Sequence, residues 1–185
     1  QLQNQDPLAP MDSTQFTQQL VQFSQVEQQI RTNEQLTGLV AQYQAASAGA
    51  ALSYLGKDAI IEADETYLAG GSANWAYNLP EAATSMTVTV KDSSGRTVYE
   101  TTTAPRGAGE HLFTWDGKKT DGTTAPDGVY TIQIEAENAD GRELTPRVNV
   151  RERIMGVDFS GSTPVVITPS GTRELGTIRS VLDIG

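Results

Sequence analysis

Three aspartates in one loop-rich stretch are the residues of this chain best suited to hold a metal ion. Asp116, Asp121 and Asp127 carry carboxylate oxygens, which are the ligands that Ca²⁺ prefers. Their spacing does not match an EF-hand loop, and each is followed by glycine, a pairing typical of tight turns. We therefore interpret the three aspartates as turn residues, with a calcium site as the alternative.

A single histidine and a group of carboxylates are the other candidates for chemistry. His111 lies in a strand-like run without a serine, cysteine or metal motif to work with, so we expect it to face solvent or a polar edge. A glycosidase needs two carboxylates opposed across a cleft, and the sequence indicates an acidic surface instead. The carboxylates in question are Glu62, Asp64 and Glu65.

Motifs of the common enzyme classes are missing from the sequence. It contains no GxSxG, HExxH, Walker A or GxGxxG pattern. Trp75 and Trp115 stand alone in strand-like runs, which favours packing in a core or at an edge over a sugar-stacking platform. We therefore predict that the protein is not an enzyme and uses no cofactor or metal.

Composition narrows the range of partners. The chain has 185 residues, a net charge of -10, a pI near 4.5 and no cysteine. Binding to nucleic acid or to an anionic membrane requires clustered Lys and Arg, so neither is expected as a partner. The sequence shows no signal peptide and no apolar run of the roughly twenty residues that span a bilayer. Because Gln1 is not an initiator methionine, we expect residues before it.

The clearest structural signal is an amphipathic helix near the start of the chain. Pro7 and Pro10 favour an extended segment, after which Asp12 and Gln15 form a capping box with Met11 as the staple residue. Apolar residues then recur every three or four positions along one face, with glutamines over much of the rest. These apolar residues are Phe16, Leu20, Phe23, Val26 and Ile30.

This apolar stripe is narrow, which is typical of a helix that packs against another chain as in a coiled coil. Docking of the helix on its own domain is the alternative. The apolar pattern resumes after Asn33 and extends the predicted helix to about Gln44, with fraying or a kink near residues 37–38. The Ala-rich segment 45–51 predicts a hinge or a helix tail, and Gly49 favours the hinge.

Beyond residue 55 the periodicity changes from helical to alternating. Short runs of β-favouring residues are separated by Gly, Pro, Asn and Asp, with hairpin turns predicted at residues 92–95 and 140–141. Strands of this length predict an Ig-like or fibronectin-type sandwich at about residues 79–144. Strand-like runs on both sides of the sandwich are compatible with a discontinuous domain.

Two stretches of the sequence resemble the bacterial flagellar hook-capping family. The first is LQNQDPLAPMD at residues 2–12, which runs into TQFTQQLVQFSQVEQQI at residues 14–30. The second is FTWDG at residues 113–117, followed by DG at 121–122 and PDGVY at 126–130, which resembles the Ig-like module of that family. Similar patterns occur in other secreted bacterial β-sandwiches, so the first stretch is the more specific.

The resemblance implies a mainly β fold with an N-terminal α-helix. In it, an Ig/fibronectin type III-like sandwich is inserted in a small tudor-like β-barrel. The implied domains are residues 1–52 for the extended segment, helix and Ala-rich hinge, residues 78–145 for the sandwich, and residues 53–77 plus 146–185 for the barrel.

The resemblance also implies a function. A family member of this kind is a non-enzymatic scaffold that caps the distal end of the growing flagellar hook and promotes polymerisation of hook protein subunits. The implied partners are hook subunits, sister subunits in a ring that is a pentamer, and the flagellar type III export apparatus. The implied location is the flagellum, extracellular at the tip of the rod-hook after export from the cytoplasm. A secreted adhesion or glycan-binding β-sandwich is the alternative function.

We expect contacts with sister subunits and with the hook tip to come from the N-terminal segment and the stripe of the helix. Desolvating large apolar side chains supplies most of the free energy of association, at roughly 25 cal/mol per Å² before entropic costs. The expected contact residues are Leu8, Met11, Phe16, Leu20, Phe23, Val26 and Ile30.

Overall fold

The computed structural model describes residues 13–161 and 163–183, with helix side chains described from Phe16 onward. The described residues form one α-helix, thirteen β-strands and one 3-10 helix. They divide into two compact units, of which the first ends at Ala46 and the second begins at Ser47. We describe the helix and the second unit, called the β unit below, each by itself.

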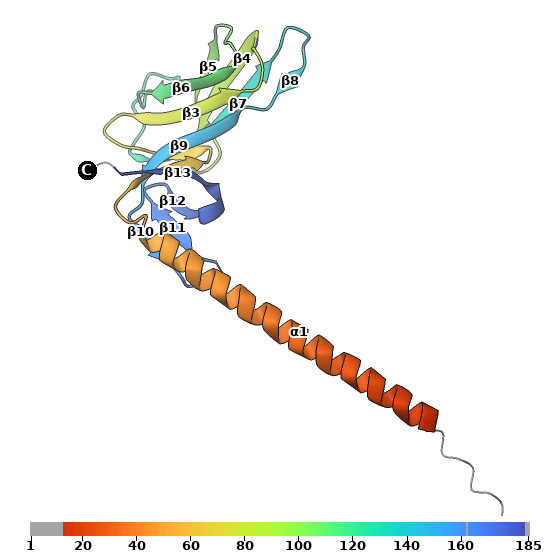
Figure 1. Cartoon of the computed structure of the whole chain (residues 1–185). Helices are drawn as coiled ribbons and strands as arrows, with labels where there is room; N and C mark the ends of the chain where they lie inside the picture. The colour runs from red at the N-terminus through yellow and green to blue at the C-terminus, as the bar shows by residue number, and fades with distance from the viewer. Residues whose placement is uncertain (1–12, 162, 184–185) are drawn as a thin grey trace, which may run out of the picture. The chain divides into compact units, whose positions relative to one another are not determined.

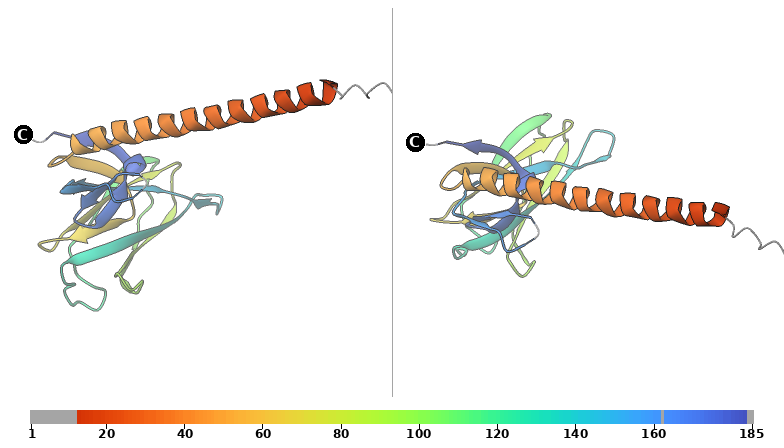
Figure 2. Two further views of the ribbon diagram at one scale, coloured as in Figure 1. Left: turned by 90° about the horizontal axis from the view of Figure 1, so that it is seen from below. Right: turned by 60° about the horizontal axis from the view of Figure 1, so that its bottom comes forward.

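Helix α1 runs without a break from Ser13 to Leu52 (Figures 1 and 2). It continues through Thr37 and Gly38, where fraying or a kink was expected. The Thr37 hydroxyl donates to the Asn33 carbonyl at 2.9 Å, so this side chain bonds to the preceding turn of the same helix. The Ala-rich segment 45–51 is helical, as alanine propensity favours, and its action as a hinge stays a prediction. The expected capping residues Met11 and Asp12 lie outside the described residues.

The first sheet has five strands in the order β13-β1-β9-β3-β6. Their bounds are Asp58–Glu62 for β1, Ala73–Leu79 for β3, Gly109–Trp115 for β6, Arg147–Arg153 for β9 and Ile178–Leu182 for β13. Strand β1 pairs antiparallel with both β9 and β13, so strands before and after the expected sandwich are hydrogen-bonded neighbours.

The second sheet has the order β2-β7-β4-β5, and β8 pairs with the end of β7. The bounds are Glu65–Leu68 for β2, Ser85–Lys91 for β4, Thr97–Thr103 for β5, Gly128–Glu137 for β7 and Glu143–Leu144 for β8. The predicted hairpin turns join β4 to β5 and β7 to β8, as expected.

A third, three-stranded sheet has the order β10-β11-β12. It consists of β10 at Gly156–Asp158, β11 at Val165–Thr168 and β12 at Gly171–Glu174, followed by a 3-10 turn at Leu175–Thr177. Strand-like runs were expected after the sandwich, but the sequence gave no sign of β10 or β12 as separate strands.

The sheets of the β unit are open and do not close into a barrel. Strand β3 pairs with β6 on one side and with β9 on the other, and β2 pairs with β7. The boundary that the resemblance implied between barrel and sandwich, between residues 77 and 78, lies inside β3. Alternation of polar and apolar residues indicates which face of a strand is buried, but it does not indicate the strand's neighbours.

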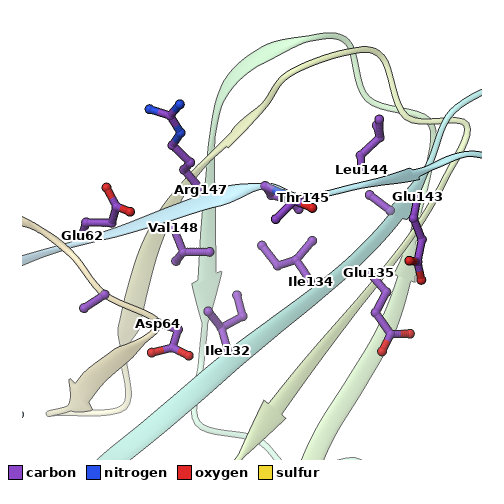
Figure 3. Close-up of a pocket in the computed structure, with 13 residues that line it drawn as sticks. Glu62, Asp64, Ile132, Ile134, Glu135, Glu143, Leu144, Thr145, Arg147 and Val148 are labelled. Carbon is purple, nitrogen blue, oxygen red and sulfur yellow. The ribbon is translucent and has the colours of Figure 1, made fainter.

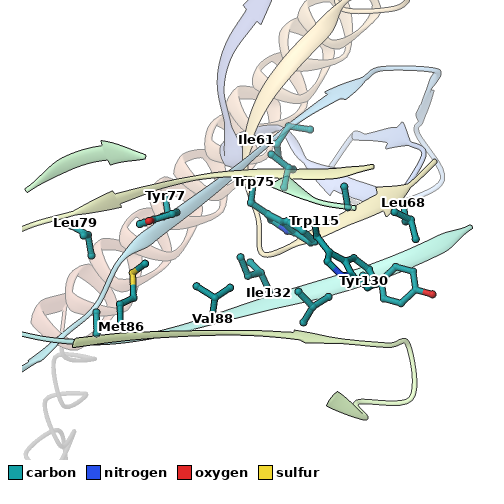
Figure 4. Packing of buried hydrophobic residues seen from close by; sticks show 14 of the residues in the cluster. Ile61, Leu68, Trp75, Tyr77, Leu79, Met86, Val88, Trp115, Tyr130 and Ile132 are labelled. Atoms are coloured by element: carbon teal, nitrogen blue, oxygen red, sulfur yellow. The ribbon is translucent and has the colours of Figure 1, made fainter. Parts of the chain in front are cut away.

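The core of the β unit lies between two layers of strands and contains both tryptophans (Figure 4). Trp75 and Trp115 are each 1 % exposed. The Trp75 indole N–H donates to the Asp64 carbonyl at 2.8 Å, and that of Trp115 donates to the Lys118 carbonyl at 2.7 Å. Because buried polar groups need partners, these bonds let both rings pack fully inside. The core interpretation of the two tryptophans is therefore confirmed.

A buried polar cluster joins the third sheet to the rest of the β unit. Glu152 of β9 is 5 % exposed, and its Oε2 accepts a hydrogen bond from the Ser170 hydroxyl at 2.7 Å. The Arg173 guanidinium donates to the same hydroxyl at 2.8 Å and forms an ion pair with Glu65 of β2 at 3.2 Å. The turn between β11 and β12 is thus tied to β9, and β12 to β2.

Candidate functional site: the apolar faces of helix α1

The five helix residues that the sequence singled out are all exposed on α1. Their exposed fractions run from 50 % at Leu20 to 69 % at Phe23. At about 100° per residue they fall within about a third of the helix circumference. We call this set the N-terminal stripe: Phe16, Leu20, Phe23, Val26 and Ile30. The other two expected contact residues, Leu8 and Met11, lie outside the described residues.

A second set of exposed apolar residues follows further along the helix. Their exposed fractions run from 55 % at Val40 to 75 % at Tyr43. In an unbroken helix this set points about 150° away from the N-terminal stripe. We call it the C-terminal stripe: Leu36, Leu39, Val40 and Tyr43. The sequence pattern indicated that one stripe continues along the helix with a loose register. The continuous helix instead places the two stripes on nearly opposite sides.

Outside the two stripes the helix surface is mostly polar and nearly uncharged, with Val21 and Leu52 as further exposed apolar residues. Glu27, Arg31 and Glu34 are the charged residues between Ser13 and Leu52. Arg31 pairs with Glu27 at 3.2 Å, and both side chains are 68 % exposed, so this pair contributes little to stability. With so few charges, apolar packing dominates what this surface can bind.

Exposed apolar stripes of this kind are the signature of an association surface. Burying one Val, Leu, Ile or Phe side chain contributes about 1.5–3 kcal/mol, and this contribution is realised only when a partner covers the stripe. Monomeric proteins rarely leave large contiguous apolar patches uncovered. The chemistry that α1 offers is therefore binding.

Two of the three aspartates considered for calcium form hydrogen bonds within the loops that contain them. Asp116 Oδ1 accepts the Lys118 backbone N–H at 3.0 Å. Asp121 Oδ1 accepts the backbone N–H and the hydroxyl of Thr123 at 2.9 and 2.6 Å, and these bonds lower the pKa of Asp121. Asp127 is exposed. These bonds support the turn interpretation, and the described residues contain no group of three or more side chains suited to hold a metal ion.

His111 and the acidic residues also have structural partners. The half-buried His111 ring stacks on Tyr77 with centroids 5.4 Å apart, and its Nε2 lies 2.8 Å from the Gly107 carbonyl. Glu62 forms an ion pair with Arg179, and Glu65 forms one with Arg173. The histidine is therefore a packing residue at the sandwich edge. Among the helices of the described chain, none combines the length and hydropathy that crossing a bilayer requires.

Two segments of the chain match models of known protein families. Residues 1–38 match the family model of the N-terminal region of the flagellar hook capping protein, and residues 63–140 match that of the FlgD Ig-like domain. The basal-body rod modification protein FlgD of Salmonella typhimurium is 31 % identical to this chain over 192 residues, covering 98 % of this chain and 82 % of its own length. This chain belongs to the flagellar hook-capping family. The Escherichia coli protein of the same name is 32 % identical with the same coverage.

Solved structures of hook-capping family members share the fold. FlgD from P. aeruginosa superposes with a TM-score of 0.61 at 21 % identity, over 70 % of this chain and 98 % of its own. FlgD from Xanthomonas campestris, whose structure is described as giving insight into the hook capping essential for flagellar assembly, gives 0.61 at 20 %, over 74 % and 99 %. The N-terminal stripe lies inside the residues that match the hook-capping model, whereas most of the C-terminal stripe follows them.

Proposed function

We propose that this protein caps the distal end of the growing flagellar hook and promotes polymerisation of hook protein subunits without catalysing a reaction. Membership of the hook-capping family supports a role in flagellar hook assembly. The observation that carries the proposal is the exposure of the N-terminal stripe on α1, which offers a protein-binding surface inside the hook-capping region. In this proposal the protein acts through the geometry of its binding surfaces and not through catalysis.

The arrangement of the two stripes suits repeated association between copies. A helix with apolar stripes on nearly opposite sides contacts two different neighbours, and head-to-tail contacts of this kind close into a ring when the rotation allows. In the proposal this ring is a pentamer. In the proposal α1 and the N-terminal segment engage sister subunits and the hook tip, and the β units form the plate beneath which each exported hook subunit folds and inserts. The protein reaches this extracellular position at the rod-hook tip through the flagellar type III export apparatus.

The test introduces a charge into the N-terminal stripe. Phe23→Asp puts a carboxylate where desolvation is required, so caps on hook filaments should disappear from electron micrographs of the protein mixed with purified hook protein. Ser24→Asp is the matched control, because Ser24 is exposed on the same stretch of helix and points about 100° away from Phe23, between the directions of the two stripes. Near-UV circular dichroism should show the tryptophan signals of the β unit unchanged in both variants. Normal capping by Phe23→Asp would refute the role of the stripe.

The alternative of a glycan-binding sandwich gains no support from the aromatic residues expected to carry it. Sugar binding of this type uses an exposed aromatic face, and both tryptophans are 1 % exposed. They contribute to the core instead.

A further inference from the structure

An apolar cleft of about 520 Å³ opens at the edge of the sandwich between β7 and β9 (Figure 3). Ile134 and Val148 are half-buried and pack against the core, so the cleft reaches the interior of the sandwich. The apolar lining consists of Ala63, Ile132, Ile134, Ala136, Leu144 and Val148. Figure 3 shows the two isoleucines of β7 and Val148 of β9 around the same space.

Strand β7 has a free edge along this cleft. Strand β2 pairs with β7 as far as Thr131, and β8 pairs with it from Ala136 onward. No described strand therefore pairs with the outer edge of residues 133–135. Unpaired strand edges are places where an extended segment of another chain can add by backbone hydrogen bonds.

The direction of the backbone groups on β7 follows from their neighbours. On the outer side, Ile132 N–H donates to the Asp64 carbonyl at 2.9 Å, and Asn138 N–H donates to the Arg142 carbonyl at 3.0 Å. Backbone groups alternate sides along a strand, so the N–H and C=O of Ile134 point to this outer side too. They present one donor and one acceptor at the cleft.

The rim of the cleft carries an excess of negative charge. Asp64, Glu135 and Glu143 are exposed, and none of the three forms an ion pair with another described residue. A fourth carboxylate of the lining, Glu62, already pairs with an arginine of β13. Arg147 is the cation of the lining. A segment that complements this rim is cationic.

We infer that the cleft binds an extended segment of the hook subunit that carries an apolar side chain flanked by lysine or arginine. The inference rests on the proposed function, which supplies the partner. The segment pairs through its backbone with Ile134, its apolar side chain enters the space between Ile134 and Val148, and its cationic side chains face Glu135 and Glu143.

Charge reversal at the rim tests the inference. Binding of the full chain to immobilised purified hook protein is measured by surface plasmon resonance at low and at physiological salt. Glu135→Lys combined with Glu143→Lys should weaken binding about tenfold or more, with a smaller effect at higher salt. Glu100→Lys combined with Glu110→Lys is the matched control, because both residues are exposed, lie outside the cleft and give the same change in net charge. The control pair should change binding less than about threefold.

Hydrogen exchange at Ile134 tests the strand addition separately. Its amide should exchange more slowly when hook protein is added to the native chain, because the N–H gains an acceptor. Equal binding by the two variant pairs, or an Ile134 amide that is unaffected while hook protein is bound, overturns the inference and leaves the proposed function standing. A native chain that neither binds hook protein nor caps hook filaments overturns the proposed function and the inference with it.

Discussion

Helix α1 and the β unit place their large apolar side chains in opposite ways. Phe23 on the helix is 69 % exposed, whereas Trp75 and Trp115 in the β unit are 1 % exposed. Both regions space apolar residues regularly. The strands of the β unit cover one another, whereas the stripes of α1 have no second element among the described residues of their own unit. Periodicity therefore specifies which face of an element is apolar, and a second element decides whether that face is covered. The β unit is thus stabilised by contacts within it. The apolar side chains of the helix stripes contribute free energy only when a partner covers them.

Removing an aromatic ring from the enclosed core should destabilise the β unit strongly. Trp115→Ala deletes an indole that packs edge-on against Tyr130, with centroids 4.9 Å apart. We expect the free energy of unfolding of the β unit to fall by about 3–5 kcal/mol, because a cavity is left behind. Phe23→Ala on the exposed stripe should leave that free energy unchanged. Urea denaturation followed by tryptophan fluorescence compares the two variants, and similar losses of stability from both would contradict the contrast between the regions.

A smaller loss is expected from the buried polar cluster of the β unit. Ser170→Ala removes a donor from the carboxylate of Glu152, which is 5 % exposed. A buried acceptor left short of a partner costs about 1–3 kcal/mol of stability. Ser180→Ala, at an exposed position on β13, should stay within about 0.5 kcal/mol of the native chain. Chemical denaturation of both variants measures the difference, and equal stabilities would mean that the Ser170 bond is dispensable.

The junction between the two regions is tested by stiffening the Ala-rich segment. An added Cβ meets nothing within 4 Å at Gly49 or at Gly38, so alanine fits at both. Each change should stabilise the helix by about 0.5–1 kcal/mol. If residues 45–51 act as a hinge, Gly49→Ala slows hook growth and Gly38→Ala does not, as measured from hook length against time in cells. An unchanged growth rate for Gly49→Ala would count against the hinge.

The smallest effect concerns the turns of the β unit at acid pH. The hydrogen bond from the Ser94 hydroxyl, together with bonds from Arg96, holds the pKa of Asp92 below its ordinary value of 3.8. Because this pKa is lower in the folded chain than in the unfolded chain, the stabilisation is complete above pH 3.8 and is lost as pH falls below it. Asp92→Asn should therefore flatten the loss of stability below pH 3.8. Thermal melts between pH 2 and 7 report it, and parallel curves for the variant and the native chain would exclude a contribution from Asp92.

Sequence reasoning located the elements whose signals are local. The apolar spacing from Phe16 to Ile30 predicted the helix, and turns such as that at Asp92 predicted the hairpins that the structure contains. Strand β12 escaped prediction because Gly171–Glu174 has no apolar alternation and becomes a strand only by pairing with β11. The direction of the C-terminal stripe was also missed, because it depends on the helix continuing through Gly38 without a break.

Local patterns in the sequence specify the secondary structure of most segments, the apolar faces of those segments and the resemblance to the hook-capping family. Periodicity and turn chemistry act over a few residues, so they can be recognised without knowing the partners of a segment. Tertiary contacts alone place β1 beside β9 and β13, β3 between β6 and β9, and Ile134 at an apolar cleft with an acidic rim. These features depend on which distant segments become neighbours, and alternation along one strand carries no information about that choice.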